Sequence, residues 1–254
     1  MQKHIYNLRR DPPDSRDRIM LAMPFKGILP KSVDFRADCP PIYDQGTLGS
    51  CTANAIGAAL DIMHNIANGI TDGFFGPSRL FIYYNERVME GTVSEDAGAC
   101  IRDGIKSVNR DGACKETTWP YDVSKFAVKP DGGCYAEAEL FQAVGYQRVP
   151  VLPLMFKSAL AAGYPIAFGI QVYASFESDE VAKTGAVPMP DTRNEQLLGG
   201  HAVCAVGYDD AKQAFIIRNS WGESWGDKGY FYLPYAFVAN ARLTSDAWAI
   251  SKAE

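Results

Sequence analysis

The segment Gln45–Cys51 reads Gln-Gly-Thr-Leu-Gly-Ser-Cys and leads into a regular helical pattern. After Cys51, apolar side chains recur at helical spacing, at Ile56, Leu60 and Met63. A glycine-containing loop that opens a helix places Cys51 in the first helical turn. Because the N-terminal end of a helix carries partial positive charge, a thiolate there is favoured. The segment predicts a cysteine nucleophile, with a buried structural cysteine as the alternative.

The segment Gly199–Tyr208 reads Gly-Gly-His-Ala-Val-Cys-Ala-Val-Gly-Tyr and predicts an apolar strand with His201 at its start. The two glycines before His201 leave room for another chain to approach the imidazole ring. A single histidine at a strand start can be structural. His4 and His64 lack such surroundings, and we interpret both as surface residues.

The segment Arg218–Tyr230 repeats Ser-Trp-Gly in a glycine-rich turn after a predicted strand. Asn219 in this turn can simply be a turn-forming residue. It can also accept the second N–H of an imidazole, which fixes the tautomer and direction of a catalytic histidine. Trp221, taken alone, is interpreted as a packing aromatic.

The spacing of these three segments favours the catalytic interpretation. Papain-type enzymes have their histidine and asparagine about 130–150 residues after the nucleophile. His201 lies 150 residues beyond Cys51, and Asn219 lies 168 residues beyond it. The stretch 177–198 holds charges and prolines without periodicity, so we expect a long loop that accounts for the excess.

Composition limits the remaining function classes. The chain has 254 residues, a formal net charge of −5 and no basic run longer than Arg9-Arg10, so nucleic-acid binding is not expected. No apolar stretch approaches the roughly 18 residues of a membrane helix, so no membrane partner is expected. The N-terminus has no apolar signal region, which makes the cytoplasm the default location, and we expect a monomer. Six cysteines without a Cys-x-x-Cys pair argue against zinc but allow one or two disulfides.

The order of the predicted elements indicates an α+β protein in two lobes. Helical patterns run from Cys51 to Ala67, from Pro77 to Val88, and from Ile101 to just before Gly112. Later segments read as strands, and they are 166–172, 202–206, 215–218, 229–233 and 248–250. Residues 1–30 are polar and punctuated by proline, which predicts an extended N-terminal arm.

The chain resembles the papain family of cysteine peptidases, in particular its bacterial branch represented by xylellain, over roughly residues 32 to 250. Val33-Asp34-Phe35-Arg36 resembles the start of the mature enzymes. The resemblance implies a mainly helical lobe over roughly 45–145 and an antiparallel, β-barrel-like lobe over roughly 146–254. The active-site cleft would lie between them, within a catalytic domain of residues 31–254.

The same resemblance implies roles for individual residues. Gln45 matches the glutamine whose amide joins the backbone N–H of Cys51 in the oxyanion hole. Trp221 matches the aromatic that shields the histidine–asparagine bond from water, and Gly98-Ala99 matches the pair that binds an extended substrate. The pocket for the second residue upstream of the cut would be formed by Cys100, Ile101, Gly199 and Gly200, with Ser245 or Asp246 at its base.

Three positions depart from the family pattern. Leu48 stands where most members have a cysteine, Thr52 replaces an aromatic residue, and Ala99 replaces the second glycine of the substrate-binding pair. None of these changes removes a catalytic group. The predicted function is therefore a cysteine endopeptidase that acts on a peptide or protein substrate through a Cys-His-Asn triad and a covalent acyl-enzyme. No metal or organic cofactor is required.

Two alternatives remain open at this stage. A thiol acyltransferase, including a transglutaminase, also pairs cysteine with histidine, and differs in whether an amine or water accepts the acyl group. A papain-like binding module without activity would usually lack a triad member. We also expect that the arm, with apolar anchors such as Tyr6 and Leu8, either restrains the cleft or stabilises the back of the protein.

Overall fold

The computed structural model describes residues 4–68, 75–143 and 145–252 of the chain. Within these ranges the α-helices and strands, in chain order, are β1 (Ser32–Asp34), α1 (Cys51–Asn68), α2 (Arg79–Glu90), α3 (Ile101–Asp111), α4 (Gly132–Ala138), β2 (Gly145–Arg148), α5 (Pro153–Ala161), β3 (Ile166–Tyr173), α6 (Asp179–Thr184), β4 (Leu197–Asp209), β5 (Ala214–Arg218), β6 (Tyr230–Pro234), α7 (Tyr235–Val238) and β7 (Thr244–Lys252). Short 3₁₀ helices add η1 (Arg36–Asp38), η2 (Val123–Lys125) and η3 (Ala174–Glu177).

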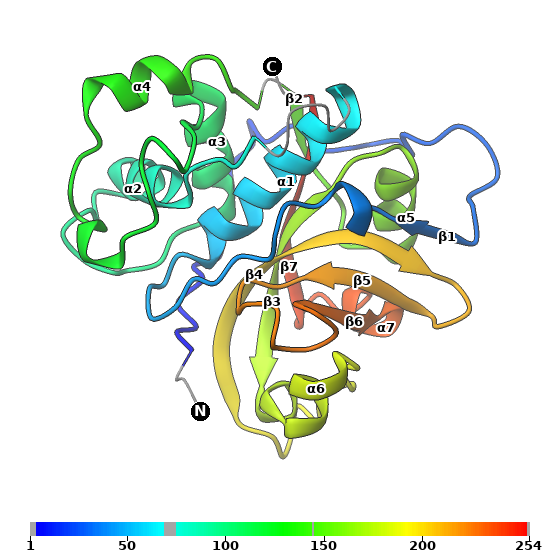
Figure 1. Ribbon diagram of the computed structural model, residues 1–254. Helices are drawn as coiled ribbons and strands as arrows, with labels where there is room; N and C mark the ends of the chain where they lie inside the picture. The colour runs from blue at the N-terminus through cyan, green and yellow to red at the C-terminus, as the bar shows by residue number, and fades with distance from the viewer. Residues whose placement is uncertain (1–3, 69–74, 144, 253–254) are drawn as a thin grey trace.

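The helical lobe is built around α1, with α2, α3 and α4 on one side of it (Figure 1). Helix α2 has clear local signals at both ends. Ser78 Oγ accepts a hydrogen bond from the Phe81 N–H at 3.1 Å, which caps the N-terminus. Gly91 adopts the left-handed conformation, with φ of 72°, that ends the helix.

The strands form one antiparallel sheet in the order β2-β7-β3-β4-β5-β6, and β1 pairs with β4 outside this path. In the described residues β2 and β6 are not paired with each other, so the sheet is curved but not closed into a barrel. Strand β4 is buried on both faces. Ala202, Cys204 and Val206 share a core with α1, whereas Val203 and Ala205 pack in the second core with α5 and α7.

These features confirm the α+β, two-lobe architecture, and helices α1, α2 and α3 lie where the sequence predicts them. The prediction of a structureless loop over 177–198 was wrong, because α6 lies inside it and β4 already begins at Leu197. Helix α6 is capped by Ser178 and ends at Gly185, which has a φ of 71°. Helices α4, α5 and α7 and strands β1 and β2 were not predicted. No helix in the described ranges is long and apolar enough to cross a membrane.

Candidate active site

The thiol of Cys51 lies at the junction of the two lobes. Cys51 is the first residue of α1 and is fully buried. Helix α1 packs on β4, and the thiol borders the backbone of Ala202, the residue after His201. Burial raises the pKa of the Cys51 thiol to about 12, which outweighs the stabilising effect of nearby backbone N–H groups. In this structure the thiol is therefore neutral at pH 7.

His201 and Asn219 meet because they lie on neighbouring antiparallel segments, in β4 and directly after β5. His201 Nε2 donates to Asn219 Oδ1 at 2.9 Å, which leaves Nδ1 as the unprotonated nitrogen, and Nδ1 has no hydrogen-bond partner. Trp221 stacks on the imidazole with ring centroids 5.0 Å apart. Burial lowers the pKa of His201 to about 4, although the bond to Asn219 opposes this effect.

The side-chain amide of Gln45 is held from both ends. Its Oε1 accepts a hydrogen bond from Ser220 Oγ at 2.7 Å, and its Nε2 donates to the Leu48 carbonyl at 3.0 Å. The Gln45 carbonyl in turn accepts from the Tyr121 hydroxyl at 3.0 Å. An amide has two N–H donors, so Gln45 keeps one that is not used by Leu48.

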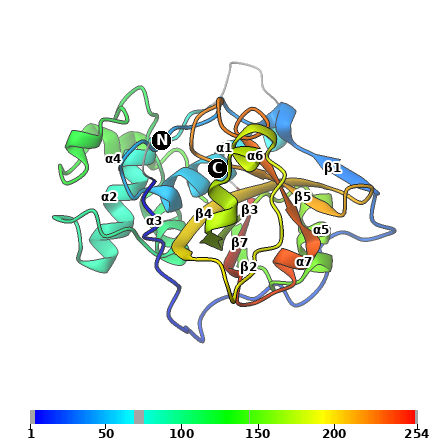
Figure 2. The same ribbon diagram turned by 90° about the horizontal axis from the view of Figure 1, so that it is seen from below.

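The N-terminal arm runs between the helical lobe and the sheet (Figure 2), and it forms bridges to both. The Leu8 N–H donates to the Gly200 carbonyl at 3.2 Å, and the Arg9 N–H donates to the Ala99 carbonyl at 3.1 Å. The arm thus forms single bridges to β4 on one side and to the start of α3 on the other. Its backbone bonds use carbonyls of the residues that the sequence assigns to substrate binding.

Two of these residues can only be glycine while the arm is present. A Cβ atom on Gly98 would lie 2.1 Å from the Asn7 carbonyl oxygen, and φ at this position is +66°. A Cβ atom on Gly199 would lie 2.5 Å from the Tyr6 carbonyl oxygen, at a φ of +143°. Both glycines therefore allow the backbone of an extended chain to lie directly against the cleft wall.

Side chains of the arm cover the candidate triad. His4 stacks on Trp221 with ring centroids 3.9 Å apart, and Tyr6 meets the edge of both Trp221 and His201. The Tyr6 hydroxyl donates to the Glu177 carboxylate. The expectation that His4 is a surface residue was wrong, because a histidine in the arm gave no local signal of a partner so distant in the chain.

Leu8 enters a small pocket in the cleft wall. A Cβ atom on Gly169 would lie 2.7 Å from Leu8 Cδ2 and 3.0 Å from Ser245 Oγ. A Cβ atom on Gly200 would lie 3.2 Å from Leu8 Cβ. The walls are thus built from two glycines and Ser245. Neither Gly169 nor its role could be read from the sequence, where it lies inside an apolar strand.

The surroundings of Asp246, Cys100 and Ile101, which the sequence also assigns to substrate binding, differ from one another. The Asp246 carboxylate is buried and accepts from Arg148 Nη2 at 3.0 Å, and its residue has a φ of 49°. Cys100 Sγ contacts the Arg10 carbonyl at 3.5 Å. Ile101 is fully buried in the core of the helical lobe.

A second set of contacts fastens the arm beyond Arg10. Asp11 accepts hydrogen bonds from the Arg102 N–H at 3.0 Å and from Trp248 Nε1 at 2.8 Å. The side chain of Asp17 is almost fully buried and pairs with Arg148 at 3.2 Å. Burial and the neighbouring Asp246 raise the pKa of Asp11 to about 6.

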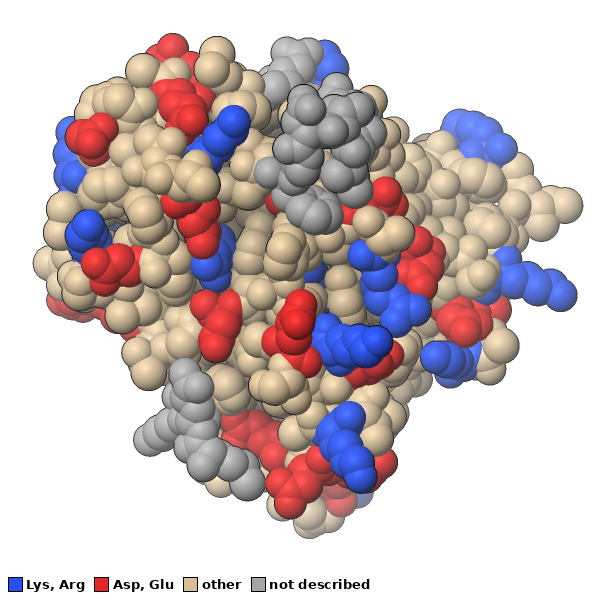
Figure 3. All heavy atoms as spheres, viewed as in Figure 1, with Lys and Arg blue, Asp and Glu red and all other residues tan. Residues whose placement is uncertain are grey.

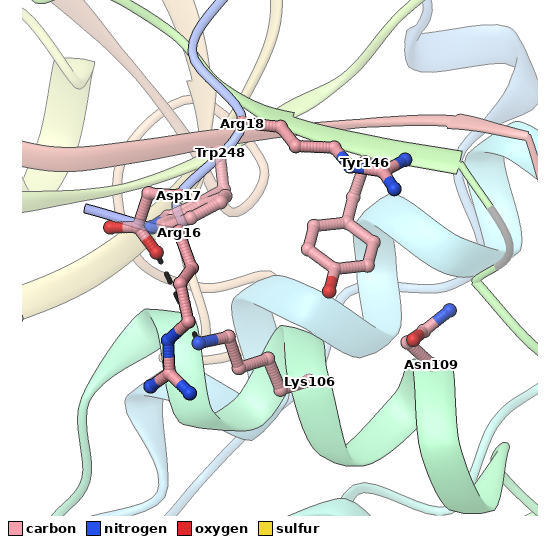
Figure 4. A pocket seen from close by; sticks show the side chains of 7 residues that line it. All are labelled: Arg16, Asp17, Arg18, Lys106, Asn109, Tyr146 and Trp248. Atoms are coloured by element: carbon pink, nitrogen blue, oxygen red, sulfur yellow. Dashed lines mark ion pairs between the residues drawn. The ribbon is translucent and has the colours of Figure 1, made fainter. Parts of the chain in front are cut away.

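Next to these contacts lies a cavity of about 270 Å³ between the arm, α3 and the sheet (Figure 4). Lys106 reaches from α3 to Asp17 across this cavity at 4.0 Å, and Tyr146 and Trp248 form its other wall. The arm is therefore held by ion pairs as well as by backbone bonds. On the face seen in Figure 3, acidic and basic side chains are interspersed.

One cluster of side chains has the composition of a metal site. Among the described residues, Glu90, Cys100 and Asp103 bring three potential ligand atoms within 4.8 Å of one another. Glu90 already accepts from the Cys100 N–H at 2.6 Å and from Arg9 Nη1 at 2.9 Å. The Arg9 guanidinium beside Glu90, and that of Arg102 at 3.7 Å from Asp103, supply positive charge at this cluster.

The chain matches known proteins in sequence over most of its length. A family model described as papain family cysteine protease matches residues 29–249. An uncharacterised peptidase C1-like protein of Acanthamoeba polyphaga mimivirus is 48% identical over 82% of this chain and 69% of its own length. Cysteine proteinase 1 of Entamoeba histolytica is 30% identical over 79% of this chain, which spans 62% of that relative.

A solved structure is similar along nearly the whole chain. Xylellain, a cysteine protease from Xylella fastidiosa, superposes with a TM-score of 0.86 at 40% identity, and the match covers 96% of this chain and 95% of xylellain. The described fold and the arrangement of its two lobes are thus shared with a cysteine protease of similar length.

Proposed function

The chain belongs to the papain family of cysteine proteases, and we propose that it is an endopeptidase in which Cys51 is the nucleophile, His201 the proton carrier and Asn219 the orienting residue. One observation carries this proposal. His201, which donates to Asn219 beneath Trp221, is directly followed in β4 by Ala202, whose backbone borders the Cys51 thiol.

Catalysis would begin with transfer of the Cys51 proton to His201 Nδ1, the ring nitrogen without a partner. The thiolate adds to the scissile carbonyl, and the imidazolium protonates the leaving amine, which leaves a thioester. His201 then accepts a proton from water, which hydrolyses the acyl-enzyme. Asn219 keeps Nε2 protonated throughout, so that Nδ1 remains the nitrogen that exchanges protons.

The developing oxyanion requires hydrogen-bond donors, and Gln45 offers the side-chain N–H that Leu48 does not use. Its amide is fixed by Ser220 and Leu48, so the remaining N–H keeps one direction. The backbone N–H of Cys51 has no intrahelical partner, because it belongs to the first turn of α1. Together these two donors would stabilise negative charge on the carbonyl oxygen.

We further propose that the arm restrains this activity. Leu8 and Arg9 use the carbonyls of Gly200 and Ala99, which an extended substrate would also use, so arm and substrate cannot bind together. The covered site also holds a neutral thiol and a neutral imidazole. Departure of the arm would readmit water, which lowers the pKa of the thiol and raises that of the imidazole.

The pocket that holds Leu8 would accept an apolar side chain from the second substrate residue upstream of the cleavage site. Its walls are glycines and Ser245, which leave space without adding charge. Asp246 at the base of the pocket would also allow a basic substrate side chain, which would compete with Arg148 for that carboxylate. An unchanged ratio of basic to apolar substrates in Asp246→Ala would exclude it.

Peptide libraries with a fluorogenic readout test the function directly. We expect hydrolysis by the wild type, none by Cys51→Ala, and a loss of at most about 10²-fold in Asn219→Ala, which orients a proton carrier and transfers no proton itself. Cys204→Ala is the matched control, since it removes another buried thiol. Activity that survives in Cys51→Ala would exclude the proposed nucleophile. Products that carry an added amine instead of a free carboxylate would indicate an acyltransferase.

A further inference from the structure

The segment 115–133 of the helical lobe is a long surface loop. It runs from the end of α3 into the first two residues of α4, and before Gly132 it contains no strand or α-helix, only the single turn η2. Of its side chains only Pro130 is buried. Trp119, Tyr121 and Phe126 are partly buried against the core, and closing the loop at its ends would restrict the remaining residues.

Both ends of this loop are cysteines, and they meet. Cys114 and Cys134 are buried together in a small cluster with Phe81 and Ala138. Both thiols are free in this structure, and each is close enough to affect the pKa of the other. Their backbones are fixed as well, since the Cys114 carbonyl accepts from the Ser78 N–H at 2.7 Å and Cys134 lies in the first turn of α4.

The loop supports the segment that leads to the nucleophile. The Tyr121 hydroxyl donates to the Gln45 carbonyl at 3.0 Å and lies 2.5 Å from Ser50 Oγ. Glu116 pairs with Arg79, whose Nη1 donates to the Asp44 carbonyl at 3.1 Å. These contacts tie the loop to residues 44–50, which lead into Cys51.

The other cysteines do not share this arrangement. Cys51 is the candidate nucleophile. Cys100 Sγ contacts the Arg10 carbonyl, and Cys204 Sγ contacts the Ala205 carbonyl at 3.8 Å. Cys39 lies near Cys204, but its thiol interacts with Tyr230. Cys39 with Cys204 is thus the competing pair.

We propose that Cys114 and Cys134 form a disulfide when the chain folds in oxidising conditions, and that this bond closes the loop 115–133 beneath the segment 44–50. Glutathione disulfide is a suitable oxidant. The Cys114 thiolate attacks one of its sulfurs and releases one glutathione. The Cys134 thiolate then attacks the Cys114 sulfur of the mixed disulfide and releases the second glutathione. Two protein thiols are oxidised, one glutathione disulfide is reduced to two thiols, and the two protein protons pass to the leaving thiolates.

The bond would stabilise the protein mainly by restricting the unfolded chain. For a closed loop of this length, in a chain of this size, we expect the melting temperature to rise by about 5–10 °C. Because both thiols are buried in the folded state, oxidation should be fast during folding and slow afterwards.

The experiment uses the full chain with Cys51→Ala, so that the reactive nucleophile does not form mixed disulfides. The protein is refolded with glutathione disulfide or with a reducing agent, alkylated, and mapped by peptide mass spectrometry. The melting temperature of each form is measured in parallel. Cys134→Ala in the same background removes one partner, and Cys204→Ala is the control that loses a different buried thiol.

We expect the oxidised protein to contain a Cys114–Cys134 peptide and to melt about 5–10 °C above the reduced form. This difference should persist in Cys204→Ala and vanish in Cys134→Ala. Because each variant is compared with its own reduced form, loss of packing does not affect the result. A Cys39–Cys204 peptide, no linked peptide, or a difference that persists in Cys134→Ala would overturn the proposal. Peptidase activity plays no part in this test, so it is independent of the proposed function.

Discussion

Replacing Leu8 by alanine tests whether the arm competes with substrate. Leu8 fills the pocket beside Gly169 and Ser245 and is partly buried. Complete burial of a leucine side chain contributes about 1.5–3 kcal/mol, so we assign about 1–2 kcal/mol to this partly buried one. At about 1.4 kcal/mol for each factor of ten, the truncation should weaken docking of the arm by about 5–30-fold.

The initial rate of peptide hydrolysis should rise by the same factor, as long as the arm covers most of the molecules. Rates are measured on one fluorogenic peptide at concentrations well below KM. Leu21→Ala is the matched control, because it removes the same side chain from the arm at a position that is 90% exposed. A synthetic peptide of residues 4–12, added to Leu8→Ala, should inhibit competitively.

Two results would refute this reasoning. Equal rates in the wild type, Leu8→Ala and Leu21→Ala, with an intact fold in each, would mean that the arm does not limit access to the cleft. A lower melting temperature in Leu8→Ala without a faster rate would assign the arm a purely stabilising role.

Two further predictions concern Gln45 and Asp11. Gln45→Ala should reduce kcat by about 10²–10³ with little change in KM, because one donor to the oxyanion is lost, and steady-state kinetics with an unchanged melting temperature checks this. A rise in KM of the same size with an unchanged kcat would contradict the role of Gln45 as an oxyanion donor. Asp11 has a pKa of about 6 in the folded chain, above its unfolded value of 3.8, so its contribution to stability is full below pH 4 and is lost as pH rises through 6. The variant Asp11→Asn removes this titration, which is worth about 1–3 kcal/mol. The melting temperature of the variant, relative to that of the wild type, should therefore be higher at pH 7.5 than at pH 4.5. A constant difference between variant and wild type across this range would contradict the prediction.

The sequence predicted those parts of the fold whose signals are local. Helix α1 follows from its apolar repeat, and α2 carries both a serine cap and a terminal glycine. Helix α6 also has a serine cap and a glycine end, but it spans only Asp179–Thr184, too short for a periodic pattern. Helix α5 was missed because apolar residues lie on several of its sides, so that Leu154 is exposed while Phe156 is buried.

The candidate site divides in a similar way. Cys51, His201 and Asn219 could be proposed from short motifs, since each belongs to a segment with its own local pattern. Ser220 and Tyr121, which fix Gln45, could not be proposed, because each acts through one hydrogen bond between segments far apart in the chain. Neither the residue type nor the spacing of this serine and this tyrosine distinguishes them from ordinary surface residues.

The start of α3 contains a signal of such a distant contact. A helix N-terminus has backbone N–H groups without intrahelical acceptors, and Ser, Thr, Asp or Asn usually supplies one locally. Helix α3 begins after Cys100, whose side chain makes no capping bond, and the acceptor for the Arg102 N–H is Asp11 of the arm. A predicted helix with a poor N-cap residue at a buried start therefore indicates an acceptor from elsewhere. In this chain that acceptor also ties the arm to the helix beside the cleft, so one carboxylate links helix stability to the covered state of the site.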